Sequence, residues 1–312
     1  VSPGTRVLYA RGASPDNGDA RGIADAVRVA RRAKVAIVVI GESRDMTGEA
    51  SSRASLELPG AQLRLLEAVK ATGTPVVVVL MNGRPLVLSR VRELAPAMLE
   101  SWFGGVEAGN ATADVLFGAY NPGGKLPVTF PRTAGQVPLY AAHRNTGRPA
   151  SVQNRYTSGY IDAPFTPLYP FGYGLSYTTF TLGAPRLSAS VMRPGETLDV
   201  AVDVTNSGTI AGDEVVQLYL RDDVASVSRP VQELRGFQRV HLAPSESRTV
   251  HFTIDERALA FHDTSMTLVA EPGTFTVAIG PDAMTASRVQ FRFETADGAS
   301  LPLSERCATS FR

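Results

Sequence analysis

The first third of the chain alternates apolar runs with amphipathic stretches. Residues 35–40 and 76–80 are apolar on both faces, as expected of strands buried between helices. Apolar residues recur at helical spacing within 21–33, and Pro59 suits the first turn of a second helix. The pattern predicts an open, doubly wound α/β domain whose crossovers are right-handed.

A third unit of the same kind follows. We expect a strand over 97–103, a helix over 106–117 and a last strand over 126–130, so that the α/β domain covers residues 1–130. Residues 131–180 lose any period and are rich in Pro, Gly, Tyr and Arg. Their aromatic content is too high for a solvated linker, which predicts an ordered connector.

The pattern changes to period two after residue 187. Alternating stretches separated by turn residues predict a β-sandwich over 181–295, followed by a tail over 296–312. The alternating stretches are 198–204, 215–220, 249–254 and 274–279.

Composition narrows the class of protein. The chain has 312 residues, 44% of them hydrophobic and 20% charged, with a formal net charge of +1, which indicates a globular protein of about two domains. No apolar run approaches the roughly 20 residues that span a bilayer, and no basic stripe suits nucleic acid. We therefore expect neither a membrane nor a nucleic-acid partner. The single cysteine, Cys307, can form no internal disulfide and leaves the compartment open.

The richest candidate chemistry lies in the loop 41–53, directly after the strand 35–40. Ligands bind outside the carboxyl ends of strands in open α/β sheets, and this loop carries three carboxylates and two arginines. Glu42 would bond loop amides or pair with Arg44, and Asp45 suits a turn. Glu49, four positions before Arg53, is the candidate general acid.

Other catalytic motifs are incomplete. Gly123-Gly124-Lys125 lacks the first glycine and the final Ser or Thr of a phosphate loop, and no Gly-x-Ser-x-Gly elbow occurs. The four histidines are dispersed without zinc-site spacing. The sequence thus predicts no metal and no cofactor, and leaves carboxylate chemistry as the best candidate.

Five segments of the chain resemble glycoside hydrolase family 3. The string from Tyr169 to Phe180 is highly specific, and the resemblance extends to about Phe293. The likeness is nearest to bacterial periplasmic β-glucosidases, which implies a periplasmic or secreted location. The segments are 38–53, 80–85, 101–105, 121–127 and 169–180.

The resemblance implies a barrel domain, an α/β sandwich domain and a fibronectin type III-like β-sandwich, of which this chain matches the last two. The family's nucleophile is an aspartate on the barrel, in a motif that does not occur here. The acid/base glutamate lies in a loop of the form Glu-Gly/Ala-x-Asp/Ser-Arg, which matches Glu49 to Arg53. Glu42, Arg53 and Trp102 would then bind substrate or support the site.

The implied activity is retaining hydrolysis of small β-glucosides or oligosaccharides, with Glu49 acting opposite a nucleophile from a barrel domain or chain. The alternative is a non-catalytic carbohydrate-binding or assembly module. The chain starts at Val1 rather than Met, and the family's α/β domain begins with a strand and helix before the segment matching 7–10. We therefore expect an exposed sheet edge that favours association, including a homo-oligomer.

Overall fold

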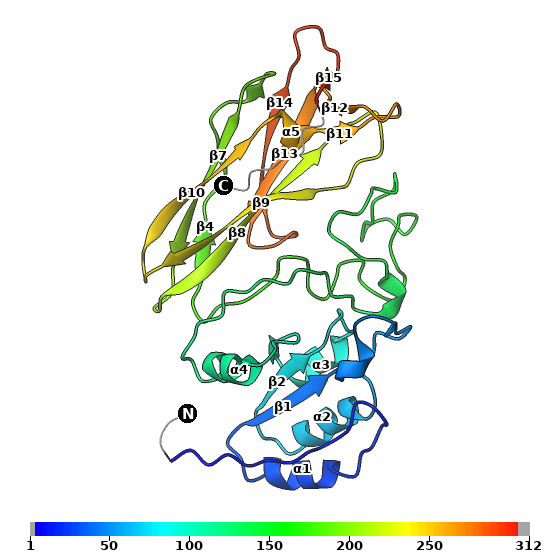
Figure 1. Ribbon diagram of the computed structural model, residues 1–312, viewed down its shortest axis with the longest axis vertical. Coiled ribbons are helices and arrows are strands. Elements are labelled where there is room, and N and C mark those ends of the chain that lie inside the picture. Colours follow the sequence, from blue (N-terminus) through cyan, green and yellow to red (C-terminus); the bar gives the residue numbers. More distant parts are fainter. Residues whose placement is uncertain (1–3, 305–312) are drawn as a thin grey trace. The chain divides into compact units, whose positions relative to one another are not determined.

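The computed structural model describes residues 4–304, which form two compact units (Figure 1). The first unit contains the residues up to 120, together with 129–139 and 165–169. The second contains residues 121–128, 140–164 and those from 170 onward. No helix among the described residues is long and apolar enough to cross a membrane.

The first unit is built on a parallel three-stranded sheet in the order β1-β2-β3. Helices α1 and α2 stack on one side of it (Figure 1). This arrangement confirms the α/β class, since each crossover between parallel strands contains a helix. The strands are β1 (Ala36–Gly41), β2 (Val76–Met81) and β3 (Ala97–Glu100), and the helices are α1 (Ile23–Ala30), α2 (Gln62–Lys70), α3 (Ser89–Leu94) and α4 (Ala108–Leu116), with 3₁₀ turns at Arg44–Met46 and Ala134–Gln136.

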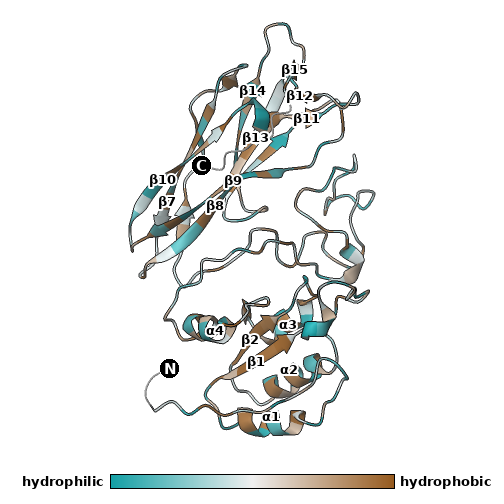
Figure 2. Ribbon diagram, viewed as in Figure 1, coloured by the Kyte–Doolittle hydropathy of each residue, from teal (hydrophilic) through white to brown (hydrophobic). Residues whose placement is uncertain are grey.

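Burial differs between the central and the edge strand of this sheet. The central strand β2 buries side chains on both of its faces, and both strands are strongly apolar in Figure 2. In contrast, β1 buries Val38 and Ile40 but leaves Ile37 42% and Val39 56% exposed. One face of the edge strand is therefore uncovered within residues 4–304.

Three details of the expected α/β domain are wrong. Residues 126–130 form no strand: Leu126 N–H donates to Tyr173, and Phe130 makes only an isolated bridge to Tyr169. Pro127 has no N–H to give to a ladder, which explains the break. The strand expected over 97–103 ends at Glu100, and α3 was missed because its six residues are too few to show a period.

The second unit is a β-sandwich of two open sheets, in which all strand pairs except β6 with β14 are antiparallel. One sheet has the order β10-β7-β4, with β5 also paired to β7, and the other has the order β6-β14-β13-β8-β9. The strands are β4 (Phe180–Leu182), β5 (Arg186–Leu187), β6 (Val191–Met192), β7 (Leu198–Asn206), β8 (Gly212–Asp222), β9 (Glu233–Leu242), β10 (Ser247–Ile254), β13 (Gly273–Gly280) and β14 (Ser287–Phe293).

Alternate residues of these strands form the sandwich core. Val200, Val202 and Val204 of β7 are fully buried, in one cluster with Phe275 and Phe291 of the other sheet. The period-two prediction of an all-β domain is thereby confirmed, although β9 and β14 were not foreseen.

A small third sheet lies at the end of the described chain. It joins β11 (Phe261–His262), β12 (Leu268–Ala270) and β15 (Leu301–Pro302), and the short helix α5 (Glu256–Leu259) precedes it. Residues 301–302 of the expected tail thus pair with β12 of this small sheet. Cys307 lies outside the described residues.

Candidate active site

The carboxyl ends of the three parallel strands carry the polar side chains of the first unit. Glu42 follows β1, residues 82–84 follow β2, and Glu100 ends β3. Because parallel strands end at the same edge, these groups gather there, and we call this edge with the loop 42–57 the carboxyl edge. It is the place that sequence reasoning singled out.

Glu42 is the buried anchor of the carboxyl edge. Its side chain is 0% exposed, and Arg53 Nη1 lies 2.5 Å and Arg84 Nε 2.9 Å from its Oε1 atom. The Gly83 N–H donates to Oε2 at 3.1 Å. The prediction that Glu42 pairs with Arg44 is wrong, since Arg53 and Arg84 pair with Glu42 instead. A buried carboxylate needs such partners because burial without them is strongly unfavourable.

Arg53 and Arg84 extend the anchor to the loop backbone. Arg53 Nη2 donates to the Glu57 carbonyl at 3.0 Å. Arg84 Nη2 donates to the carbonyls of Met46 and Ser51, the latter at 3.2 Å. Sequence reasoning did not assign Arg84 to the site, although the segment Asn82-Gly83-Arg84 directly after a buried strand was a usable signal.

Glu49 stands apart from this ion cluster. It lies in a turn between Gly48, with φ +100°, and Ala50, with φ +58°, that the Ser51 N–H closes by donating to the Gly48 carbonyl at 3.3 Å. Its side chain is exposed. Within residues 4–304 no hydrogen bond or ion pair holds its carboxylate. Of the two loop glutamates, Glu49 is thus exposed to solvent, whereas both carboxylate oxygens of Glu42 are bound by partners.

The end of β3 carries a second, different carboxyl group. Glu100 accepts hydrogen bonds from the Trp102 N–H at 3.0 Å and from Asn82 Nδ2 at 3.3 Å. Burial outweighs these bonds and raises the pKa of Glu100 from 4.5 to about 7. The Oδ1 atom of the fully buried Asn82 has no partner among the described residues. Sequence reasoning missed Glu100, since nothing in its neighbourhood marked it as buried.

Trp102 turns the chain away from β3. Its φ of +50° is unusual for a bulky side chain, and the bond from its N–H to Glu100 stabilises that turn. The half-buried ring packs on Phe130, with 5.8 Å between ring centroids. The structure thus places Glu42 and Arg53 in one cluster and Trp102 at the end of another strand.

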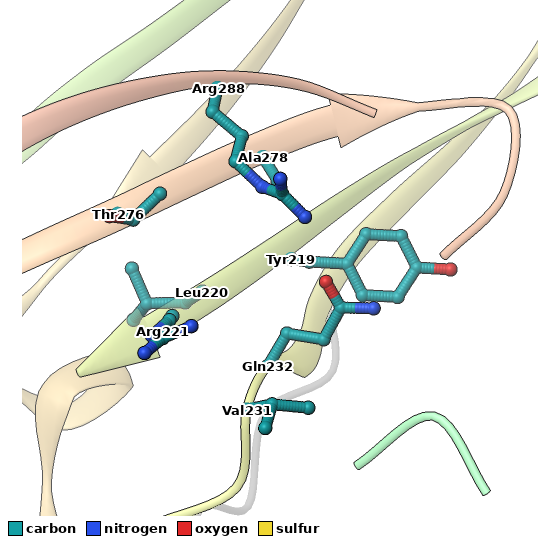
Figure 3. Close-up of a pocket in the computed structure, with 8 residues that line it drawn as sticks. All are labelled: Tyr219, Leu220, Arg221, Val231, Gln232, Thr276, Ala278 and Arg288. Atoms are coloured by element: carbon teal, nitrogen blue, oxygen red, sulfur yellow. The ribbon is translucent and has the colours of Figure 1, made fainter. Parts of the chain in front are cut away.

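Three other places where a ligand could bind offer no site for a sugar or a metal ion among the described residues. Lys125, the lysine of the incomplete phosphate loop, pairs with Glu214 at 2.7 Å. In the described part of the chain no group of three or more His, Cys, Asp or Glu side chains is arranged to hold a metal ion. A hollow on the sandwich, beside Tyr219 and Arg288, has a volume of about 30 Å³ (Figure 3). That is the space of about one water molecule, far too little for a sugar ring.

The open α/β domain with its acid-bearing loop and the β-sandwich that follows it each match the model of a known domain. The model of the glycosyl hydrolase family 3 C-terminal domain matches residues 7–177, and that of the fibronectin type III-like domain matches residues 214–283. The chain belongs to glycoside hydrolase family 3. The resemblance deduced from the sequence is confirmed.

Named relatives agree with this assignment. The periplasmic beta-glucosidase of Salmonella typhimurium is 47% identical over 315 residues, which cover 93% of this chain and 41% of that protein. A beta-xylosidase of Formosa agariphila is 43% identical over 90% of this chain and 38% of its own length. The crystal structure of a Listeria innocua beta-glucosidase in complex with glucose aligns with a TM-score of 0.84 at 41% identity, over 88% of this chain and 38% of that one.

The chain therefore spans about two fifths of the length of these relatives. The shared region contains both units of the structure, since it covers about nine tenths of this chain.

Proposed function

We propose that this chain is the acid/base-bearing part of a retaining β-glucosidase, with Glu49 as the general acid and base. The contrast between the two loop glutamates supports this role for Glu49. Glu42 has both oxygens bound and a fully buried side chain, whereas Glu49 is exposed and has no side-chain partner among residues 4–304, on a loop whose backbone Arg53 and Arg84 hold. Only the second is available to a substrate.

The reaction needs a second carboxylate about 5 to 5.5 Å from Glu49. Neither Glu42, which is enclosed by its arginines, nor Glu100, which binds the Trp102 amide, suits that role. We therefore assign the nucleophile to a barrel domain outside these residues, as the family resemblance implies. This chain without that barrel should be inactive.

The steps follow from these roles. An aspartate of the barrel attacks the anomeric carbon, while Glu49 gives its proton to the departing glycosidic oxygen, so that a glycosyl-enzyme and a free alcohol form. Glu49, now a carboxylate, takes a proton from water. The water oxygen then displaces the aspartate and releases the sugar with its original anomeric configuration.

Support for the substrate comes from the relatives. Proteins named beta-glucosidase and beta-xylosidase are 47% and 43% identical to this chain. We propose terminal β-linked glucose in small glucosides or oligosaccharides as the substrate, with xylose as the nearest competitor. The name of the Salmonella relative supports a periplasmic or secreted location.

The test is the leaving-group dependence of Glu49→Gln in the complete enzyme. A substrate with a poor leaving group needs the proton, so its glycosylation rate should fall by about 10²–10⁴-fold, whereas that of an activated aryl glucoside should fall far less. Asp45→Asn removes a carboxylate of the same loop and serves as the control, with both rates unchanged. Wild-type rates of Glu49→Gln on both substrates would exclude Glu49 as the acid.

A further inference from the structure

One guanidinium group fixes both ends of the segment that contains Glu49. Arg84 Nη2 carries two N–H bonds, and it donates to the carbonyls of Met46 and of Ser51, the latter at 3.2 Å. Glu49 lies between these two residues. Since the Glu49 carboxylate has no partner of its own among residues 4–304, its place depends on the backbone that Arg84 holds.

The guanidinium is itself fixed from behind. Arg84 Nε lies 2.9 Å from Oε1 of Glu42 without hydrogen-bond geometry, and the charge of this buried carboxylate holds it there. The Gly83 N–H and Arg53 in turn fix Glu42. The Arg84 side chain is only 18% exposed, so these interactions are poorly screened by water.

Packing supports the same segment from a second side. A Cβ atom on Gly83 would lie 2.3 Å from Thr47 Oγ1 and 3.1 Å from a ring carbon of Phe103. The end of β2 therefore touches the loop closely at Thr47, next to the Met46 carbonyl that Arg84 binds. The loop is fixed there by contacts as well as by charge.

We infer that Arg84 is a positioning residue for the acid/base glutamate. It fixes residues 46–51 against the end of β2, so that Glu49 keeps one position before substrate arrives. The inference rests on the function proposed for Glu49. Lysine cannot replace arginine here, because its single ammonium nitrogen sits on a flexible chain. It lacks the rigid planar group that faces Glu42 through Nε while Nη2 binds both carbonyls.

The first test measures amide hydrogen exchange in the 312-residue chain, which needs no barrel. Arg84→Lys should speed exchange in residues 46–52 about tenfold, the effect of losing one charge-assisted hydrogen bond. Protection of β2 and α2 should stay unchanged. Arg64→Lys, an exposed arginine on α2, is the matched control and should leave the loop as it is. Unchanged exchange in 46–52 for Arg84→Lys would overturn the inference.

The second test is kinetic and uses the complete enzyme. Arg84→Lys should lower kcat on a poor leaving group about tenfold more than on an activated aryl glucoside, with KM nearly unchanged. A rise in KM with kcat preserved would overturn the inference, because Arg84 would then bind substrate directly. If Arg84→Lys also loses the protection of β2, both measurements are made on Glu42→Gln, which removes the charge behind Arg84, with the same outcomes expected.

The two proposals fail separately. Suppose that loop exchange is faster in Arg84→Lys and that Glu49→Gln keeps wild-type rates. Arg84 would then still fix the loop, but Glu49 would not be the general acid. A defect in Glu49→Gln together with unchanged exchange in Arg84→Lys would keep the general acid and remove the positioning role.

Discussion

Gly83 shows how a single residue limits what the carboxyl edge can contain. It sits where β2 ends, its N–H donates to Glu42 at 3.1 Å, and no side chain fits between it and Thr47. The glycine is needed here for space, because its φ is not positive. Small residues of this kind allow two backbone segments to approach closely.

Substitution of Gly83 by alanine should therefore lower stability. The added methyl group must displace Thr47 or Phe103, and overpacking of this kind costs about 1–3 kcal/mol. Urea unfolding followed by Trp102, the single tryptophan, reports on this unit. Gly109→Ala on α4 is the control, since its Cβ meets nothing within 4 Å and stability should hold or rise by up to about 1 kcal/mol. Equal midpoints for both variants would refute the packing argument.

At the end of β3, burial favours the protonated form of the Glu100 carboxyl group. The raised pKa of Glu100, about 7, means that the folded state binds this proton more tightly than the unfolded chain does. The folded protein is therefore more stable when Glu100 is protonated. Stability from this group is fully present below about pH 4.5 and is lost as the pH rises through about 7.

This pH dependence can be measured with the tryptophan beside it. The Trp102 emission should titrate with a midpoint near pH 7, because the backbone N–H of Trp102 donates to the Glu100 carboxyl group and places that group beside this residue. Between pH 4.5 and 8 the unfolding free energy of this unit should fall by about 3 kcal/mol more than in Glu100→Gln, which keeps the acceptor but not the charge. Identical pH profiles for both proteins would show that Glu100 does not titrate in this range.

The elements of the sheet follow from sequence far better than the contacts at its edge do. Continuous apolar runs identify β1 and β2, although only β2 is buried on both faces and β1 leaves one apolar face uncovered within residues 4–304. Glu42 and Arg84 are 42 positions apart, so no local pattern joins them, and the nearby Arg44 was the natural but wrong partner. Pro127 explains why the strand expected at 126–130 does not form.

Some site residues could be recognised from the local sequence, whereas the surroundings of others arise only when the chain folds. Glu49 could be selected from the sequence because its setting matches a family motif, and that assignment stays a prediction. The burial of Glu100 could not be foreseen, since it arises from contacts with Asn82 and Trp102 that only the folded sheet brings together. Trp102 was noted, but its packing on Phe130 depends on a residue 28 positions later.

The uncovered apolar face of β1 should make the separate chain associate with itself. Ile37 and Val39 are 42% and 56% exposed on an edge strand. Edge strands with apolar faces favour pairing with other chains. The 312-residue chain by itself should therefore self-associate with rising concentration.

Sedimentation velocity over a range of concentrations can test this. The double variant Ile37→Lys with Val39→Lys should stay monomeric where the unchanged chain associates, because lysines on an edge oppose pairing. Val106→Lys changes a fully exposed apolar residue outside the strands and should not alter association. A chain that remains monomeric without any substitution would disprove the expectation.

Azide rescue tests whether Glu49 serves as both acid and base. In the complete enzyme, Glu49→Ala should form the glycosyl-enzyme from an activated aryl glucoside and then stall, because no base activates water. Azide needs no base, so it should restore turnover and yield a glucosyl azide with the configuration of the substrate. Glu49→Ala that hydrolyses the substrate at the wild-type rate, or stalls without any azide product, would show that Glu49 is not the acid and base.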